Sequence, residues 1–245
     1  GPLLSFDPAR PPAAPPTLVR YYTDPQLTWR SDTRAWFERR ARLAAMPRTA
    51  AKVEDFRALL PRSTRVYIAH IDGTPIEDMV STARRIAGEG FEVMPHFPAR
   101  SIPSRAALAD WIDRYQGEAG VTSALLLGGG VSAPRGDFHC SMQLMETGLF
   151  DRAGFRRLHV AGHPEGNTDI DPDGSERNVM AALRWKQAFA ERSDAEMALA
   201  TQFVFEAAPV VDWAARLRAG VQAEMAVESG TAPCARPPPD FARAI

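Results

Sequence analysis

Val160-Ala161-Gly162-His163-Pro164-Glu165-Gly166-Asn167 is the stretch of this chain that decides the fold. It begins as an apolar run typical of a buried strand and ends abruptly in polar residues. A second stretch of the same design, Ala200-Thr201-Gln202-Phe203-Val204-Phe205-Glu206, follows further along the chain. Parallel α/β sheets build their functional sites from polar groups at the carboxyl ends of buried strands. The two stretches therefore predict a parallel sheet with a site at one edge.

The rest of the chain alternates between strand-like and helical segments. The predicted strands are Leu43–Met46, Val66–Ile71, Phe91–Phe97, Ser123–Leu127, Leu158–Gly162, Met197–Phe205 and Ala223–Val227, of which the first and last are weak. The predicted helices between them are Pro75–Gly88, Ser104–Gln116, Met142–Leu149, Asp173–Phe189 and Pro209–Leu217. Alternation at this spacing indicates right-handed βαβ units and a parallel sheet.

This order of elements favours a (β/α)₈ barrel, the TIM-barrel architecture. A doubly wound open sheet is the alternative, although the chain has no glycine-rich dinucleotide loop. After Val227 the sequence turns proline-rich, so we expect the barrel to be incomplete at its C-terminal end. An unclosed barrel exposes two sheet edges. We expect a homo-oligomer, a protein partner or the N-terminal arm to cover them.

Domain organisation follows from the same pattern. Residues 1–40 comprise a proline-rich arm and a leading helix, predicted over residues 31–43, and residues 41–245 form one barrel-like domain. At 245 residues and 45% hydrophobic, the chain is long enough for one large core.

Composition excludes several classes of function. Net charge is −1 and there is no dense basic run, which argues against a nucleic-acid or membrane-surface partner. No apolar segment approaches the length of a membrane span, and no signal-peptide pattern opens the chain. The histidines lack the spacing of metal ligands. We therefore expect a cytoplasmic protein without a bound metal.

The two stretches quoted above, in this order, resemble the methylenetetrahydrofolate reductase family, whose strands end in Tyr-Pro-Glu-x-His-type and Thr-Gln-Phe-Phe-type sequences. The resemblance covers about Ala44 to Val227. It implies a TIM-barrel flavoprotein, an oxidoreductase of folate one-carbon metabolism. In such an enzyme NADH or NADPH reduces FAD, which then reduces 5,10-methylenetetrahydrofolate to 5-methyltetrahydrofolate.

The resemblance also implies a set of site residues. Gln202 would bind the folate, because an amide both donates to and accepts from the amide and amine edge of a pterin. Phe203 would stack on the flat ligand. The residues implied to contact FAD are His96, Gly129, Gly130, Ala161, His163, Asn167 and Lys186.

Lys186 has a second interpretation that comes from the sequence pattern. It lies on the stripe Val179, Leu183, Lys186 at helical spacing, which faces the core. A lysine on such a stripe either extends its amine to water or meets an anion. If the amine meets a ligand instead of water, the resemblance implies that this ligand is a phosphate or ribose of the flavin.

Two departures from the family pattern leave the activity open. Alignment on Met46-Pro47 puts Ala44 where the family has its glutamate, the general acid that helps to open the bridging methylene ring. Alanine cannot transfer a proton. Gly130 stands where the family has an aspartate near the flavin. One hypothesis is therefore a reductase-like enzyme, and the other is a redox-inactive folate-binding relative or a subunit that serves a methyl-transfer partner.

Overall fold

The computed structural model describes residues 42–62, 64–201 and 207–224. Its strands are β1 (Arg42–Ala45), β2 (Arg65–Ile68), β3 (Glu92–Pro98), β4 (Ser123–Leu127), β5 (Arg157–Gly162) and β6 (Glu196–Thr201). Its helices are α2 (Pro47–Ala50), α3 (Ile76–Gly88), α4 (Arg105–Ala119), α5 (Ser141–Glu146), α6 (Leu149–Arg152), α7 (Arg177–Arg192) and α8 (Ala207–Glu224), with 3₁₀ helices η2 (Phe56–Ala58) and η3 (Ala99–Ser101).

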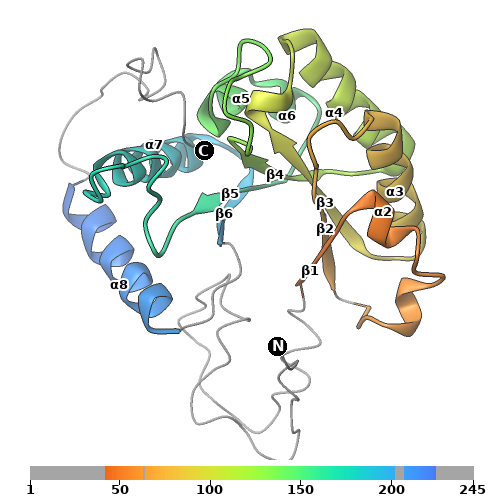
Figure 1. The fold of residues 1–245 in the computed structure, drawn as a ribbon, viewed down its shortest axis with the longest axis horizontal. Helices are drawn as coiled ribbons and strands as arrows, with labels where there is room; N and C mark the ends of the chain where they lie inside the picture. The colour runs from red at the N-terminus through yellow and green to blue at the C-terminus, as the bar shows by residue number, and fades with distance from the viewer. Residues whose placement is uncertain (1–41, 63, 202–206, 225–245) are drawn as a thin grey trace, which may run out of the picture.

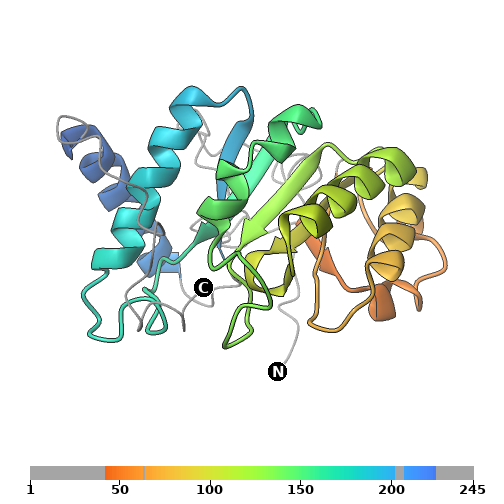
Figure 2. The same cartoon turned by 90° about the horizontal axis from the view of Figure 1, so that it is seen from above.

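The six strands form one sheet in the order β1-β2-β3-β4-β5-β6, and every neighbouring pair is parallel. A doubly wound sheet reverses its strand order at a switch point, and this sheet does not, so that alternative is wrong. The sheet curls, and α3, α4, α7 and α8 lie outside it (Figures 1 and 2). The parallel α/β fold is confirmed as a curled half-barrel. A complete eight-stranded barrel is not seen within the described ranges.

Alternation along the strands divides the sheet into two faces. Outward side chains such as Val66, Ile68 and Leu126 are buried in the main core beneath the helices. Inward side chains, among them Tyr67 and Met94, form a smaller cluster on the concave face. The helices therefore cover one face, and the concave face carries most of the polar groups discussed below.

Local sequence explains where several helices begin and end. Ser104 precedes α4, and its hydroxyl accepts a hydrogen bond from Ala107 N at 3.1 Å. Gly120 ends that helix with φ of 63°, a conformation that glycine adopts without strain. On α3, the buried Met79, Ala83 and Ile86 repeat at helical spacing toward the sheet.

Three sequence predictions need correction. Ala223 and Glu224 belong to α8, so the strand predicted from Ala223 is wrong there, and the remainder of that segment lies outside the described residues. The predicted helix Met142–Leu149 is divided into α5 and α6, because Gly148 takes a left-handed φ of 64° between them. Arg42 and Leu43, at the end of the predicted leading helix, lie in β1. The arm and the rest of that helix are outside the described residues.

The start of α7 differs as well. The helix begins at Arg177 instead of Asp173, because Asp171 provides the cap. The buried Asp171 carboxylate accepts from Asn178 N at 2.9 Å and from Val179 N at 3.0 Å. Residues 172–175 are thereby left as a turn, in which Asp173 accepts from Ser175 N.

None of the helices in the described segments is both long and apolar enough to cross a membrane.

Candidate functional site

The carboxyl edge of the sheet brings together most of the residues expected to bind FAD. Because the strands are parallel, their carboxyl ends meet at one edge. His96 lies near the end of β3, Gly129 and Gly130 follow β4, and Ala161 and His163 lie at the end of β5. Asn167 follows in the loop that leads to α7.

Lys186 reaches this edge from α7. Its side chain is buried with 6% of its surface exposed, and Nζ donates to Ala161 O at 3.2 Å. Desolvation lowers the pKa of Lys186 to about 8. Within the described part of the chain no carboxylate lies within ion-pair distance of the amine. The buried ammonium therefore has spare N–H donors and a charge that this part of the protein does not neutralise.

His163 and Asn167 lie beside Lys186. Asn167 Nδ2 is 3.4 Å from His163 Nδ1, and Asn167 Oδ1 accepts from Asp169 N at 2.9 Å, which holds the loop in a turn. Burial, followed by the positive charge of Lys186, lowers the pKa of His163 to about 4. His163 is therefore a neutral imidazole at physiological pH. The three side chains form one cluster.

His96 faces the concave side of β3. Burial, followed by the nearby His70, lowers the pKa of His96 to about 4, so this imidazole is neutral too. Its ring lies edge-on to Tyr67, with 6.3 Å between the ring centroids. His96 thus lies near the inward cluster, at the same edge as His163.

The two glycines after β4 differ in their surroundings. Gly129 has φ of +98°, and a Cβ there would lie 3.0 Å from Pro98 Cβ. That close approach packs the ends of β3 and β4 together, so Gly129 has a structural role whether or not it contacts a ligand. Gly130 is exposed, and a Cβ there would meet nothing within 4 Å. The structure supplies no carboxylate at this position.

Ala44 lies on the concave wall. It pairs with Tyr67 in the parallel register, and the adjacent Ala45 is buried in the outer core. Ala44 and Tyr67 therefore share the inward face. Nothing at position 44 can donate a proton, as the sequence indicated.

The predicted folate contacts, Gln202 and Phe203, lie outside the described residues. β6 ends at Thr201, which pairs with Gly162 of β5.

Sequence reasoning missed Arg100, which follows β3. Its side chain is 2% exposed, Nε donates to His139 O at 3.2 Å and Nη1 donates to Val131 O at 3.1 Å. These two bonds tie down the long loop after β4. Burial lowers the pKa of Arg100, while the charge of Asp169 acts in the opposite direction. A lone arginine after a strand gives no sequence signal of such burial.

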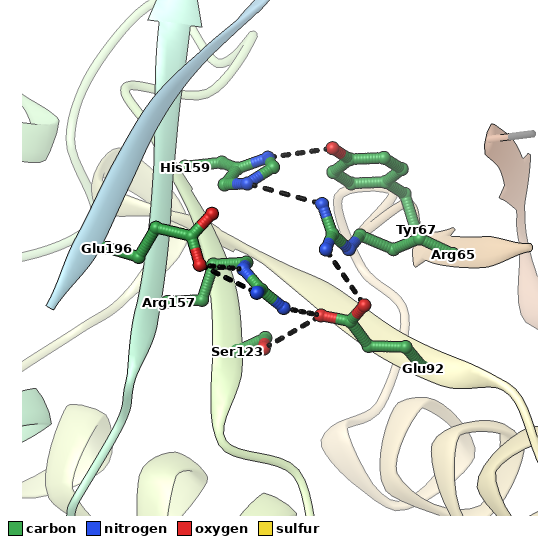
Figure 3. A network of polar contacts seen from close by, with 7 residues as sticks. All are labelled: Arg65, Tyr67, Glu92, Ser123, Arg157, His159 and Glu196. Carbon is green, nitrogen blue, oxygen red and sulfur yellow. Dashed lines mark hydrogen bonds and ion pairs between the residues drawn. The ribbon is translucent and has the colours of Figure 1, made fainter. Parts of the chain in front are cut away.

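Sequence reasoning also missed a polar network on the concave face (Figure 3). The first residues of the five strands from β2 to β6 form it: Arg65, Glu92, Ser123, Arg157 and Glu196. Glu92 is the centre, because it accepts from Arg65 at 2.8 Å, from Ser123 at 3.3 Å and from Arg157. Arg157 also pairs with Glu196 at 2.6 Å. Each of these strands begins with a polar residue that an apolar residue follows, and this alternation is the sequence signal that could have indicated the network.

Electrostatics within the network favour the ionised forms. Burial alone would raise the pKa of Glu92, but the hydrogen bonds and charges of Arg65 and Arg157 outweigh it and hold that pKa below its ordinary value. Glu196 and Glu92 together raise the pKa of Arg157 further above its ordinary value. The network therefore ties strands β2 to β6 at their amino ends.

One layer nearer the carboxyl edge, the fully buried His159 joins the network to Tyr67 (Figure 3). Tyr67 Oη is 2.7 Å from His159 Nδ1, and Arg65 Nη1 is 3.4 Å from His159 Nε2. The sequence pattern did not reveal this contact, since the two residues are 92 positions apart.

Among the described residues, no group of three or more His, Cys, Asp or Glu side chains could hold a metal ion. A scan against models of known protein families finds none that matches this chain.

Proposed function

We propose that the carboxyl edge binds FAD, and that the protein is a methylenetetrahydrofolate reductase-like oxidoreductase that uses NADH or NADPH. The observation that carries the proposal is the buried Lys186, held beside His163 and Asn167 with no carboxylate partner in the described part of the chain. A buried ammonium needs compensation, and an anionic or carbonyl-bearing ligand supplies it.

The donor set fits a flavin. Lys186 offers spare N–H groups to phosphate or carbonyl oxygens, and neutral His96 and His163 offer flat, uncharged rings beside a flat heterocycle. When bound, FAD supplies the hydride transfer that no side chain can perform. The tasks of the protein are to orient the ring, to exclude water and to present the folate to it.

A second candidate is a folate-binding relative without the redox step. Ala44 on the inward face and the exposed Gly130 favour it, since both usual carboxylates are absent. Losing a positioned acid ordinarily lowers a rate by about 10²–10⁴-fold. Under either candidate we propose Gln202 and Phe203 as folate contacts, and a second copy, a partner or the N-terminal arm as the cover of edge strands β1 and β6.

Purified protein tests the flavin proposal directly. We expect the wild-type protein to be yellow and to be bleached by NADH or NADPH under anaerobic conditions. Lys186→Met should lower the affinity for FAD about tenfold or more, as expected for the loss of a charge-assisted hydrogen bond. Equilibrium titration of the apoprotein with FAD, followed by flavin fluorescence, measures the change.

Lys52→Met is the matched control, because Lys52 is exposed and far along the chain from the cluster. Equal FAD affinity in the wild type and in Lys186→Met would contradict the proposed site. A colourless wild type that binds folate by calorimetry, with no affinity for FAD, would favour the second candidate.

A further inference from the structure

Arg100 carries a buried positive charge, and within the described ranges no carboxylate lies at ion-pair distance from it. A guanidinium has five N–H donors. In Arg100, Nε donates to His139 O and Nη1 donates to Val131 O, whereas Nη2 is closed to solvent and has no acceptor in the described part of the chain. Backbone carbonyls accept hydrogen bonds but carry no net charge. The charge of Arg100 is therefore not neutralised by its direct contacts.

One carboxylate, that of Asp169, acts on Arg100 from a distance. Its charge raises the pKa of Arg100, while burial lowers that pKa by more. Asp169 is exposed, and the two side chains form no ion pair. Water screens an exposed charge at this range, so Asp169 compensates only part of the cost of burying the guanidinium.

The run Gly128-Gly129-Gly130 lies against Arg100. Gly128 O accepts from Arg100 N at 2.9 Å, and Val131 O, directly after the run, accepts from Nη1. Gly129 has φ of +98°, which turns the chain between these two contacts. Gly130 is exposed, and a Cβ there would meet nothing within 4 Å. An open stretch of backbone without side chains therefore lies beside the buried guanidinium.

Phosphate matches this combination of groups. A planar guanidinium donates two parallel hydrogen bonds to phosphate oxygens. Successive backbone N–H groups in a turn also bind anions, and the turn at Gly129 brings such groups close to Arg100. Because Nη2 is closed to solvent, the turn has to shift before an anion reaches it. Glycines allow that shift without the repacking of a side chain.

We propose that Arg100 and the turn at Gly129 and Gly130 bind the phosphate group of a small-molecule ligand. The inference goes beyond the proposed function, because phosphate binding here requires neither a flavin nor a folate. Arg100 joins the loops after β3 and β4, whereas Lys186 contacts Ala161 on β5. The carboxyl edge then has two buried cations, each of which binds a different anionic group.

Titration of the purified protein with inorganic phosphate tests the site. Sodium phosphate replaces sodium chloride at constant pH and ionic strength, and calorimetry follows the binding. We expect saturable binding of one phosphate per chain. Arg100→Lys keeps the charge but loses the planar pair of donors, so it should weaken this binding about tenfold or more. A wild type that shows no saturable binding overturns the proposal and leaves the flavin proposal untouched.

Arg105→Lys is the matched control. Arg105 is exposed, and its Nη2 donates to a backbone carbonyl, Thr147 O, at 2.7 Å. This variant should bind phosphate as tightly as the wild type does. An equal loss of affinity in Arg100→Lys and Arg105→Lys would mean that phosphate is attracted by the total positive charge, which overturns the site.

Gly130→Val tests the site with Arg100 intact, and it decides the matter if Arg100→Lys does not fold. The valine side chain occupies the open side of the turn. Phosphate affinity should fall, while the thermal unfolding midpoint stays that of the wild type, since a Cβ at this position meets nothing within 4 Å. Unchanged phosphate affinity in Gly130→Val overturns the proposed route to Arg100.

Asp169→Asn gives a change of the opposite sign. Removal of the carboxylate that acts on Arg100 should strengthen phosphate binding about two- to fivefold, the usual effect of one exposed charge. Weaker binding in this variant would contradict the assignment of the phosphate to Arg100.

AMP and adenosine identify the source of the phosphate group. If AMP binds more tightly than both adenosine and inorganic phosphate, and Arg100→Lys removes that advantage, the ligand is a nucleotide. If AMP and inorganic phosphate bind equally tightly, the site takes free phosphate or a small phosphate ester. Adenosine that binds as tightly as AMP, with no effect of Arg100→Lys, would overturn the site.

Discussion

At the scale of single residues, Lys186 shows a conflict between stability and ligand binding. Its amine is buried, and its hydrogen bond to Ala161 O does not replace the water it has lost. Binding sites often contain such groups, because the compensating partner arrives with the ligand. The residue that we propose for FAD binding should therefore destabilise the ligand-free protein.

Lys186→Met should stabilise the ligand-free protein at neutral pH by about 1–3 kcal/mol, because methionine keeps the volume and removes the buried charge. The pKa is about 8 in the folded protein, against an ordinary value of 10.5. Since folding disfavours the charged amine, the wild type loses stability as pH falls from 10.5 to 8, and the full penalty applies below 8. Urea unfolding across this range measures the difference, which should vanish above pH 10.5. A less stable variant at neutral pH would contradict this reading.

At the scale of elements, the close packing of α8 against the sheet depends on Gly162 at the end of β5. A Cβ at Gly162 would lie 2.7 Å from an atom of the Trp213 ring, which α8 packs against the sheet. Trp213 is buried with Ile170, Val179 and Leu183. The small residue at the end of β5 is what lets the helix approach this closely.

Gly162→Val should displace Trp213 and destabilise the protein by about 1–3 kcal/mol, the usual effect of overpacking. A shift of tryptophan emission to longer wavelength would accompany it. Gly130→Ala is the control, because a Cβ at this exposed position meets nothing within 4 Å. Equal stability of Gly162→Val and the wild type would show that α8 does not pack at this point.

At the scale of the whole molecule, a half-barrel must hold its curvature across strands that are far apart in the chain. The network centred on Glu92 ties together strands β2 to β6 on the concave face (Figure 3). Sheet hydrogen bonds join only neighbours, but these side chains also join β3 directly to β5. The network therefore stabilises the arc as a unit.

Glu92→Gln should make stability less dependent on acid pH. The folded pKa of Glu92 lies below its ordinary value of 4.5, because Arg65 and Arg157 stabilise the carboxylate. Its contribution is therefore present above pH 4.5 and is lost as pH falls through the folded value. Thermal unfolding midpoints should differ most between wild type and variant near neutral pH and converge in acid. A constant difference across pH would mean that the charge of Glu92 contributes nothing.

Much of the fold was predictable because strand and helix periods are local. The strands near Ser123–Leu127 and Leu158–Gly162 were placed within one residue of β4 and β5. Polar residues at strand ends, with the rule that parallel strands end together, put His96 and His163 at the carboxyl edge of the sheet, and Asn167 lies beside His163. The start of α7 could not be predicted, because its cap, Asp171, lies outside the helical pattern and acts by a hydrogen bond across the turn.

The sequence by itself determined the parallel α/β order, the polar carboxyl edge and the absence of an acid at Ala44, since each depends on residue type and short-range spacing. Only the tertiary structure decided that Tyr67 meets His159 and that Glu92 joins Arg65 to Arg157. Those contacts depend on how far each strand is staggered against the next and how tightly the sheet curls. Both are set by packing of the whole sheet against its helices, which no local pattern encodes.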